Sequence, residues 1–245
     1  MDIMEAINIR SSRRTYTDQV IEAPKVDKLR KLIAQLNQES GLNLQLYTNN
    51  GEAFSGLKMS YGLFKNVKNY VALIGNTNDP DLLEKVGYYG EKVVLEATRL
   101  DLGTCWVGGT YDKKTCKCDI KEQEKLLGII TLGYTQEIRP LKERMIYTLI
   151  HRKSKTISEM LTSDTDHPNW LLQGMEAVLK APSAVNQQPV RFQYKEGVLT
   201  AQVTEKLGYE LMDLGIAKLH FEIGSNYSGQ WQWGNKAPYI PLQKK

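Results

Sequence analysis

The run Arg10-Ser11-Ser12-Arg13-Arg14, called here the basic segment, places guanidinium groups and hydroxyls side by side along the chain. A guanidinium pairs with phosphate oxygens through two parallel hydrogen bonds, and a serine hydroxyl adds a short one. The basic segment therefore suits a small anion such as a phosphate group. Taken alone, such a run is more often a solvated turn after a helix, so an anion site needs support from other residues.

A second segment, Ala181-Pro182-Ser183-Ala184-Val185-Asn186-Gln187-Gln188-Pro189, is called here the amide loop. Its prolines stiffen a stretch that carries a hydroxyl and several side-chain amides. Each amide offers a donor and an acceptor together, which matches the edge of a heterocycle such as an isoalloxazine. The same composition is typical of an ordinary turn, and composition does not decide between the two.

Two further segments are candidates for the same site. Gly103–Gly109 (Gly-Thr-Cys-Trp-Val-Gly-Gly) contains glycines that let another group approach the backbone, or it is simply a helix-to-strand turn. Lys142 and Arg144 follow Pro140, and in an extended chain two such side chains share one side. They either clamp the same phosphate as Arg10 or are solvated. The chain has neither a phosphate-loop motif nor G-x-G-x-x-G.

Other chemistries find little support in the residue pattern. Cys116 and Cys118 lack partners at zinc spacing, and the histidines are His151, His167 and His220. We therefore expect no metal site. The sequence also lacks the G-x-S-x-G and H-E-x-x-H motifs of hydrolases.

Hydrophobic periodicity predicts the helices that position these segments. They are expected over 3–10 with Asp2 as N-cap, Val26–Leu36, Val86–Leu102, Pro168–Lys180 with Leu171, Met175 and Val178 inward, and Leu211–Ile223. Gly103 stands where the left-handed residue that ends a helix belongs.

Short apolar runs predict strands over Tyr70–Ile74 and Gly128–Gly133. Arg191–Tyr194 and Val198–Val203, separated by Gly197, are expected to form a hairpin. The polar stretch 151–168 is the best candidate for a linker between two halves.

Composition limits the class of protein. The chain has 245 residues, 41% of them hydrophobic and 24% charged, enough for one large or two small domains. A net charge of +4 without a basic stripe argues against a nucleic-acid partner. No apolar stretch approaches the roughly 20 residues that cross a bilayer, and the N-terminus lacks a signal-peptide pattern. With an odd cysteine count and no disulfide spacing, we expect a cytoplasmic protein without membrane contact.

Taken together, four of these segments resemble motifs of the FMN-dependent nitroreductase family. Ala6-Ile7-x-x-Arg10-x-Ser12-x-Arg14-x-Tyr16 is similar to its opening phosphate motif. Ala181-Pro182-Ser183-Ala184-x-Asn186-x-Gln188-Pro189-x-Arg191-Phe192 is similar to its flavin-contacting loop. Gly87–Gly109 resembles its central helix and following turn, and Lys142 with Arg144 matches its late basic pair. The matched stretches cover well under half of the chain.

The order of the motifs differs from that of the usual family member, in which the flavin-contacting loop follows the first helices and the flavin lies between two identical subunits. Here that loop lies late in the chain, and Gln38-Glu39-Ser40-Gly41 stands in its early place. The chain resembles the fused-tandem branch, the TM nitroreductase type, in which one polypeptide imitates the dimer.

This resemblance implies an α+β, nitroreductase-like fold in two tandem halves, residues 1–152 and 153–245. Each half is expected to hold a central antiparallel or mixed sheet flanked by helices. The two halves would form a monomeric pseudo-dimer with one composite flavin site, capable of further self-association.

The resemblance also implies which residues bind FMN. Arg10, Ser12, Lys142 and Arg144 would hold its phosphate, with Ser11 and Arg14 close by. The remaining contacts to the flavin would come from backbone at Trp106, Val107 and Gly108 and, from the other half, from Pro182, Ser183, Asn186 and Gln188. No side chain is assigned as a catalytic acid or base.

The activity implied is hydride transfer from NADH or NADPH, through FMN, to a small acceptor such as a nitroaromatic, a quinone or a free flavin. The absence of a dinucleotide fingerprint agrees with a nicotinamide that visits only transiently. A non-catalytic flavin-binding protein and a degenerate scaffold without cofactor are the alternatives, since duplication frees one site to decay. All of this requires the basic segment and the amide loop to enclose one ligand.

Overall fold

The computed structural model describes residues 1–54, 64–150 and 154–242. Its chain divides into two compact units. Unit 1 comprises Met1–Asn8, Leu83–Lys92 and Ile150–Lys245, and unit 2 comprises Ile9–Leu82 and Val93–Leu149. The boundary predicted between residues 152 and 153 lies outside the described residues and stays a prediction.

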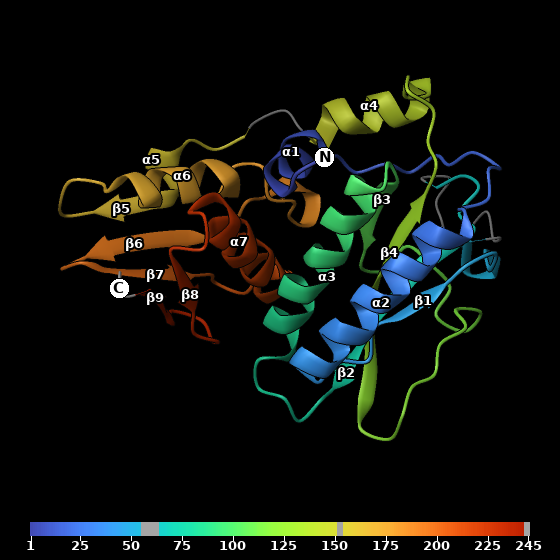
Figure 1. Ribbon diagram of the computed structural model, residues 1–245, viewed down its shortest axis with the longest axis horizontal. Coiled ribbons are helices and arrows are strands. Elements are labelled where there is room, and N and C mark those ends of the chain that lie inside the picture. Colours follow the sequence, from blue (N-terminus) through green and yellow to red (C-terminus); the bar gives the residue numbers. More distant parts are fainter. Residues whose placement is uncertain (55–63, 151–153, 243–245) are drawn as a thin grey trace. The chain divides into compact units, whose positions relative to one another are not determined.

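Unit 2 is built on a four-stranded antiparallel sheet in the order β1-β2-β4-β3 (Figure 1). The strands are β1 (Gln45–Tyr47), β2 (Asn69–Asn76), β3 (Gly103–Val107) and β4 (Glu124–Gly133). The strands predicted from the apolar runs are confirmed and are longer than predicted. The run Tyr70–Ile74 is apolar throughout because each of its residues is buried.

The helical elements of unit 2 are α2 (Ala23–Ser40), the second part of α3 (Leu82–Arg99), α4 (Leu141–Ile150) and the short 3₁₀ turn Glu52–Phe54. The prediction for α2 is confirmed: Pro24 lies in its first turn, and Leu29, Ile33 and Leu36 are buried. Gly41, at φ 72°, ends the helix in the left-handed conformation that glycine adopts without steric cost.

Unit 1 contains a mixed five-stranded sheet in the order β5-β6-β7-β9-β8, in which only β5 and β6 run parallel. The strands are β5 (Leu161–Ser163), β6 (Arg191–Lys195), β7 (Val198–Gln202), β8 (Gly229–Trp231) and β9 (Pro238–Pro241). The predicted hairpin β6–β7 is confirmed, with Glu196 and Gly197 at positive φ in its turn. One antiparallel and one mixed sheet with flanking helices confirm the predicted α+β class.

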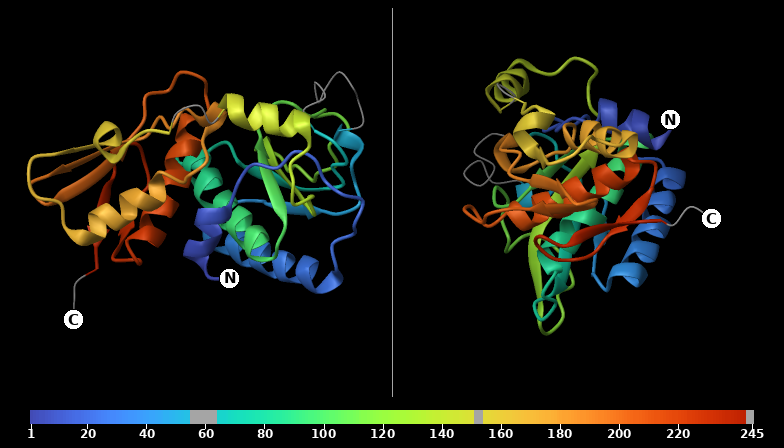
Figure 2. Two further views of the ribbon diagram at one scale, coloured as in Figure 1. Left: turned by 90° about the horizontal axis from the view of Figure 1, so that it is seen from above. Right: turned by 90° about the vertical axis from the view of Figure 1, so that its left-hand side faces the viewer.

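The helices of unit 1 are α1 (Ile3–Ile9, which ends in unit 2), α5 (Ile157–Met160), α6 (Asn169–Val178) and α7 (Glu210–Gly224). Asp2 accepts a hydrogen bond from the Glu5 N–H at 2.7 Å, which confirms its N-cap role. The helices α6 and α7 lie side by side (Figure 1, Figure 2).

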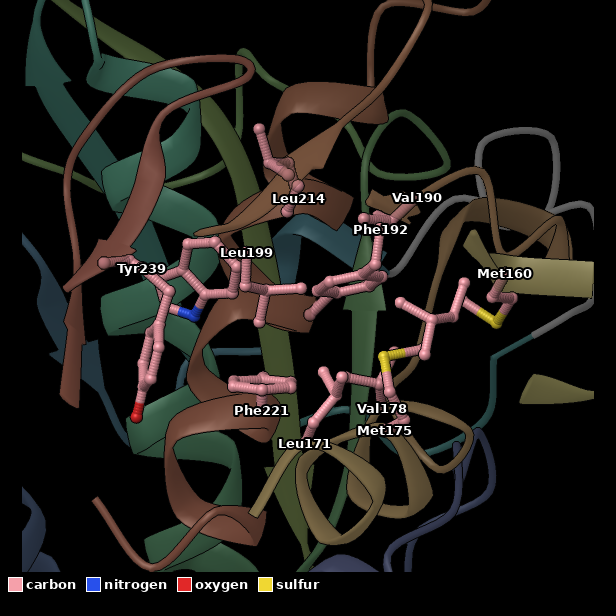
Figure 3. Close-up of a cluster of buried hydrophobic side chains, with 14 of the residues drawn as sticks. Met160, Leu171, Met175, Val178, Val190, Phe192, Leu199, Leu214, Phe221 and Tyr239 are labelled. Atoms are coloured by element: carbon pink, nitrogen blue, oxygen red, sulfur yellow. The ribbon is translucent and has the colours of Figure 1, made fainter. Parts of the chain in front are cut away.

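The core of unit 1 lies between these two helices and the sheet (Figure 3). Leu171, Met175 and Val178 of α6 are buried there, as their helical spacing predicts. Phe192 of β6 and Phe221 of α7 stack with ring centroids 5.9 Å apart. This packing fixes α6 and the start of β6, the two elements that precede and follow the amide loop, against α7.

The first half of α3 crosses α7 within unit 1 at very close range. A Cβ added to Gly215 would lie 1.9 Å from the Glu84 carbonyl oxygen, so only glycine permits this approach. Buried polar pairs join the helices on either side: Lys218 Nζ lies 2.5 Å from a Glu84 carboxylate oxygen, and His220 Nε2 lies 3.0 Å from Glu91. These contacts fix the register of α7.

Two predictions about local structure are wrong. Gly103 does not end the long helix in a left-handed conformation: α3 ends at Arg99, Asp101 takes the positive φ of 62°, and Gly103 is the first residue of β3. The stretch 151–168 is not simply a linker, because α5 and β5 form within it and β5 pairs with β6. Short elements of this kind depend on a distant strand and leave no periodic signal.

Within the described ranges, no helix is both long enough and apolar enough to span a lipid bilayer.

Candidate functional site

The basic segment runs beside β3 in unit 2. Ser12 forms a parallel bridge with Thr104, and the Arg13 N–H donates to the Thr104 carbonyl at 2.8 Å. The Arg13 Cβ would lie 3.0 Å from a Cβ at Gly103, so the glycine admits the segment to the strand edge. The structure therefore brings together two segments, the basic segment and Gly103–Gly109, that the sequence only suggested were related.

A buried carboxylate on α4 anchors this segment. Glu143 is 2% exposed and accepts a hydrogen bond from Arg13 Nε at 2.9 Å and one from the Thr15 N–H at 3.2 Å. Arg13 also donates to the Gln136 carbonyl at 2.7 Å. The Arg13 guanidinium is thus bound by groups of the protein itself.

Arg139 is a member of the cluster that the sequence did not single out. Its Nη2 donates to Ser11 Oγ at 2.6 Å, its Nε lies 3.9 Å from Glu143, and its guanidinium lies over the Tyr147 ring. Burial lowers the pKa of Arg139, and the positive charge of the neighbouring Arg13 lowers it further. The only available signal was a third basic residue just before Pro140, next to the predicted pair Lys142 and Arg144.

Cys105 of β3 is buried beside the basic segment. Burial raises the pKa of the Cys105 thiol, while the Arg14 charge, a Ser12 hydrogen bond and the Arg10 charge act in the opposite direction. The pKa of the Cys105 thiol therefore responds to all three residues. Within residues 1–54, 64–150 and 154–242, the Arg14 guanidinium forms no ion pair, so its charge is not neutralised by a carboxylate.

Lys142 and Arg144 do not share one side, contrary to the prediction. The two lie in the helix α4 rather than in an extended chain. In a helix, the side chains of residues i and i+2 are separated by about 200° around the axis. Both side chains are exposed, with the buried Glu143 between them. A role for either in holding a phosphate stays a prediction.

The end of β3 presents backbone rather than side chains. Val107 points into the core of unit 2 with Tyr70 and Ile129, and Trp106 is half-buried. A Cβ at Gly128 would lie 3.1 Å from the Val107 carbonyl oxygen, so the neighbouring strand is tightly packed there. A ligand at this edge would meet the main chain of Trp106–Gly108.

In unit 1 the amide loop is closed by its own side chains. The Gln188 N–H donates to Ser183 Oγ at 2.9 Å. The Gln188 side chain is buried, with its Oε1 accepting from the Lys155 N–H at 2.7 Å and its Nε2 donating to the Leu179 carbonyl at 3.3 Å. Gln188 is thus used largely in shaping the loop, whereas Pro182, Ser183 and Asn186 are only partly covered.

The donor set of unit 2 fits a phosphate monoester. Arg10, Arg14 and Arg139 supply guanidiniums, and Ser11 and Ser12 supply hydroxyls. The buried carboxylate of Glu143 is already paired with Arg13. Such an excess of positive charge with short hydroxyl donors is the chemistry that phosphate recognition uses. That the amide loop contacts the same ligand stays a prediction.

Comparison with known proteins identifies the family. The profile of the family described as "Putative TM nitroreductase" matches residues 2–225. The chain belongs to this family. No curated protein matches the chain.

Solved structures give the fold. A crystal structure described as a putative nitroreductase from Thermotoga maritima is 22% identical with a TM-score of 0.65, and the match covers 100% of this chain and 95% of that one. An FMN-dependent nitroreductase from Clostridium difficile is 20% identical with a TM-score of 0.45, over 56% of this chain and 89% of that one. A nitroreductase with bound FMN from Bacteroides fragilis is 18% identical with a TM-score of 0.43, over 58% and 92%. The full-length match shows that this chain has a nitroreductase-like fold.

Sequence reasoning missed the residues that hold the basic segment and the amide loop in place. Glu143 and Arg139 do so in unit 2, and Lys155 and Asp213 do so around the amide loop. Each acts across a long stretch of chain, so no local motif marks it.

Proposed function

We propose that this nitroreductase-family protein is an oxidoreductase that binds FMN and transfers hydride from NADH or NADPH to a small acceptor. The observation that carries the proposal is the basic segment held beside β3, with Ser12 bridged to Thr104 and Ser11 hydrogen-bonded to Arg139. The basic segment with Arg139 offers the charge and the hydroxyl donors that the phosphate of FMN requires.

The magnitude of such a site is sufficient for cofactor binding. Each charge-assisted hydrogen bond contributes roughly 1.5–3 kcal/mol net. Several acting together reach micromolar affinity, about −8 kcal/mol, after the costs of association. Lys142 and Arg144 are proposed to attract the phosphate of FMN at long range from α4, without both binding it directly.

The roles of the chain are binding and orientation. FMN, when bound, supplies the hydride-transfer chemistry, so no acid or base side chain is required. The Trp106–Gly108 main chain is proposed to face the ring. From the amide loop, Pro182, Ser183, Asn186 and Gln188 are proposed to approach it. A nitroaromatic, a quinone or a free flavin is proposed as acceptor, and the reducing cytoplasm, which suits three free thiols, as the compartment.

Anaerobic mixing tests this function. The purified protein is loaded with FMN, separated from free flavin and mixed with NADH or NADPH while absorbance near about 450 nm is followed, where oxidised flavin absorbs. Rapid bleaching followed by recovery of colour on adding a quinone is the expected result. Bound flavin that neither donor bleaches would identify a non-catalytic flavin protein, and failure to take up FMN would identify a cofactor-free scaffold.

A further inference from the structure

The amide loop has a backbone that is costly to form. Val185, Asn186 and Gln188 have φ values of 44°, 55° and 45°, in the left-handed region. A β-branched residue such as Val185 rarely adopts this conformation, because its Cβ crowds the backbone. Val185 is also 66% exposed, so its own packing does not compensate. Backbone strain of this kind persists only where surrounding contacts enforce it.

Lys155 enforces it from one side. Its Nζ donates to the Gln187 carbonyl at 2.9 Å and to the Gln188 carbonyl at 2.6 Å. Its backbone N–H binds the Gln188 side chain as well. Arg191 Nη1 adds a further donor to the Gln188 carbonyl at 3.1 Å. One lysine thus binds two successive carbonyls at the strained end of the loop, which requires that they point the same way.

Asp213 enforces it from the other side. It lies in the first turn of α7, is buried, and its two carboxylate oxygens lie 3.1 and 3.2 Å from the Ala184 nitrogen. This contact fixes the residue directly before Val185. Burial raises the pKa of Asp213 to about 7, the Ala184 N–H lowers it, and the charge of Glu210, one turn earlier on α7, raises it.

A buried carboxylate that carries so large a desolvation cost needs a reason to be there. Glu210 has one, because it accepts hydrogen bonds from the N–H groups of Leu207, Gly208 and Tyr209 at the start of α7. Asp213 makes none of these helix contacts, and its hydrogen bond goes to the amide loop. Its place in the fold is explained by the loop and not by the helix.

We propose that Lys155 and Asp213 are positioning residues that hold the amide loop in its strained conformation and so preorganise it for the flavin. This inference rests on the proposed function. Preorganisation raises affinity because the ordering of the loop no longer has to occur at binding. Neither residue is proposed to touch the cofactor.

The test combines hydrogen exchange of single amides with FMN titration of the full-length protein. Asp213→Ala removes the acceptor of the Ala184 N–H. Opening of the loop is then followed by exchange of the Gln188 N–H, which is hydrogen-bonded to Ser183. Lys155→Met removes the donor to the carbonyls of residues 187 and 188, and opening is then followed by exchange of the Ala184 N–H. Asp213→Asn keeps a carbonyl acceptor and is the rescue variant. Asp166→Ala and Lys195→Met, both at exposed side chains, are matched controls.

We expect Asp213→Ala and Lys155→Met to speed exchange of the reporter amides at least about tenfold and to weaken FMN binding at least about tenfold. Asp213→Asn and the controls should stay within about threefold of wild type. Unchanged exchange in both variants would show that Lys155 and Asp213 do not hold the loop. Faster exchange with unchanged FMN affinity would show that holding the loop does not prepare it for the flavin. If wild type binds no FMN, the proposed function fails, and the exchange rates alone still decide whether the two residues hold the loop.

Discussion

The basic segment of unit 2 and the amide loop of unit 1 are stabilised in opposite ways. The basic segment is held by side chains: Arg13 and Arg139 converge on Glu143. Arg14 forms no ion pair with any carboxylate among the described residues. In the amide loop, the scaffold binds main-chain groups, through Lys155 and Asp213, and the backbone takes unfavourable dihedral angles.

Under the proposed function, this difference reflects two kinds of binding surface. A phosphate site needs concentrated charge, and the buried Glu143 orders the guanidiniums of Arg13 and Arg139. A surface that recognises the edge of a heterocycle needs a fixed backbone, and the strain is offset by contacts from elsewhere in the unit. Substitutions in the two regions should therefore have different signatures.

The largest effect is expected from removing the anchor of the basic segment. Glu143→Ala leaves the partly buried Arg13 and Arg139 without their carboxylate, and breaking such a pair should lower the free energy of unfolding by about 3 kcal/mol. Urea unfolding measures this. Glu137→Ala, at an exposed acid close by in sequence, should change it by less than about 0.5 kcal/mol. Equal effects of the two substitutions would show that Glu143 is not the anchor.

Next in size is the loss of the positive charge of Arg14. Arg14→Ala should weaken FMN binding about 10- to 100-fold, the equivalent of one charge-assisted hydrogen bond, with little change in unfolding. Fluorescence titration measures the affinity. Arg30→Ala, at an exposed arginine on α2, should leave it unchanged. An Arg14→Ala protein that binds FMN like wild type would remove Arg14 from the site.

For the amide loop, the expected signature is a pH dependence of the free energy of unfolding. Burial raises the pKa of Asp213 from its ordinary value of 3.8 to about 7. The folded protein then binds more protons than the unfolded chain between these values, so the free energy of unfolding falls as pH rises through that window. From about pH 5 to about 6.5, wild type should lose up to about 2 kcal/mol more than Asp213→Asn. Parallel pH profiles would contradict a buried, titrating Asp213.

The smallest effect concerns the strain itself. Val185→Gly should raise the free energy of unfolding by up to about 1 kcal/mol, because relief of a left-handed β-branched residue slightly exceeds the entropy cost of glycine. Val198→Gly, at a similarly exposed valine of β7, should lower it. Thermal unfolding of both variants compares them. A Val185→Gly protein that is clearly less stable would mean that the loop is not strained there.

The sequence predicted those parts of the fold that depend on local periodicity. The helices α2 and α6 and the hairpin β6–β7 were found because one face of each is buried in a regular pattern, and α7 was found from its apolar residues, although it is buried almost throughout. The conformation of Gly103 was missed, since Asp101 ends the helix and the glycine is needed for contact with Arg13. Lys142 and Arg144 were expected in an extended chain because the helix α4 gives them no clear periodic signal.

The candidate site divides in the same way. The basic segment and the amide loop are marked by composition, so their residues could be named from the sequence. The residues that hold these segments could not be named from the sequence, because Glu143 lies 130 residues from Arg13 and Asp213 lies 29 residues from Ala184. Pairings of that range depend on the packed fold, which no short motif encodes.

The central claim is that the basic segment of unit 2 holds the phosphate of FMN, and riboflavin, which lacks that phosphate, tests it most directly. The measurement is the ratio of the dissociation constants of riboflavin and FMN for the purified wild-type protein. Loss of several charge-assisted contacts at about 1.5–3 kcal/mol each predicts that FMN binds at least about 100-fold more tightly. Equal affinity for the two flavins would contradict the phosphate site and the function built on it.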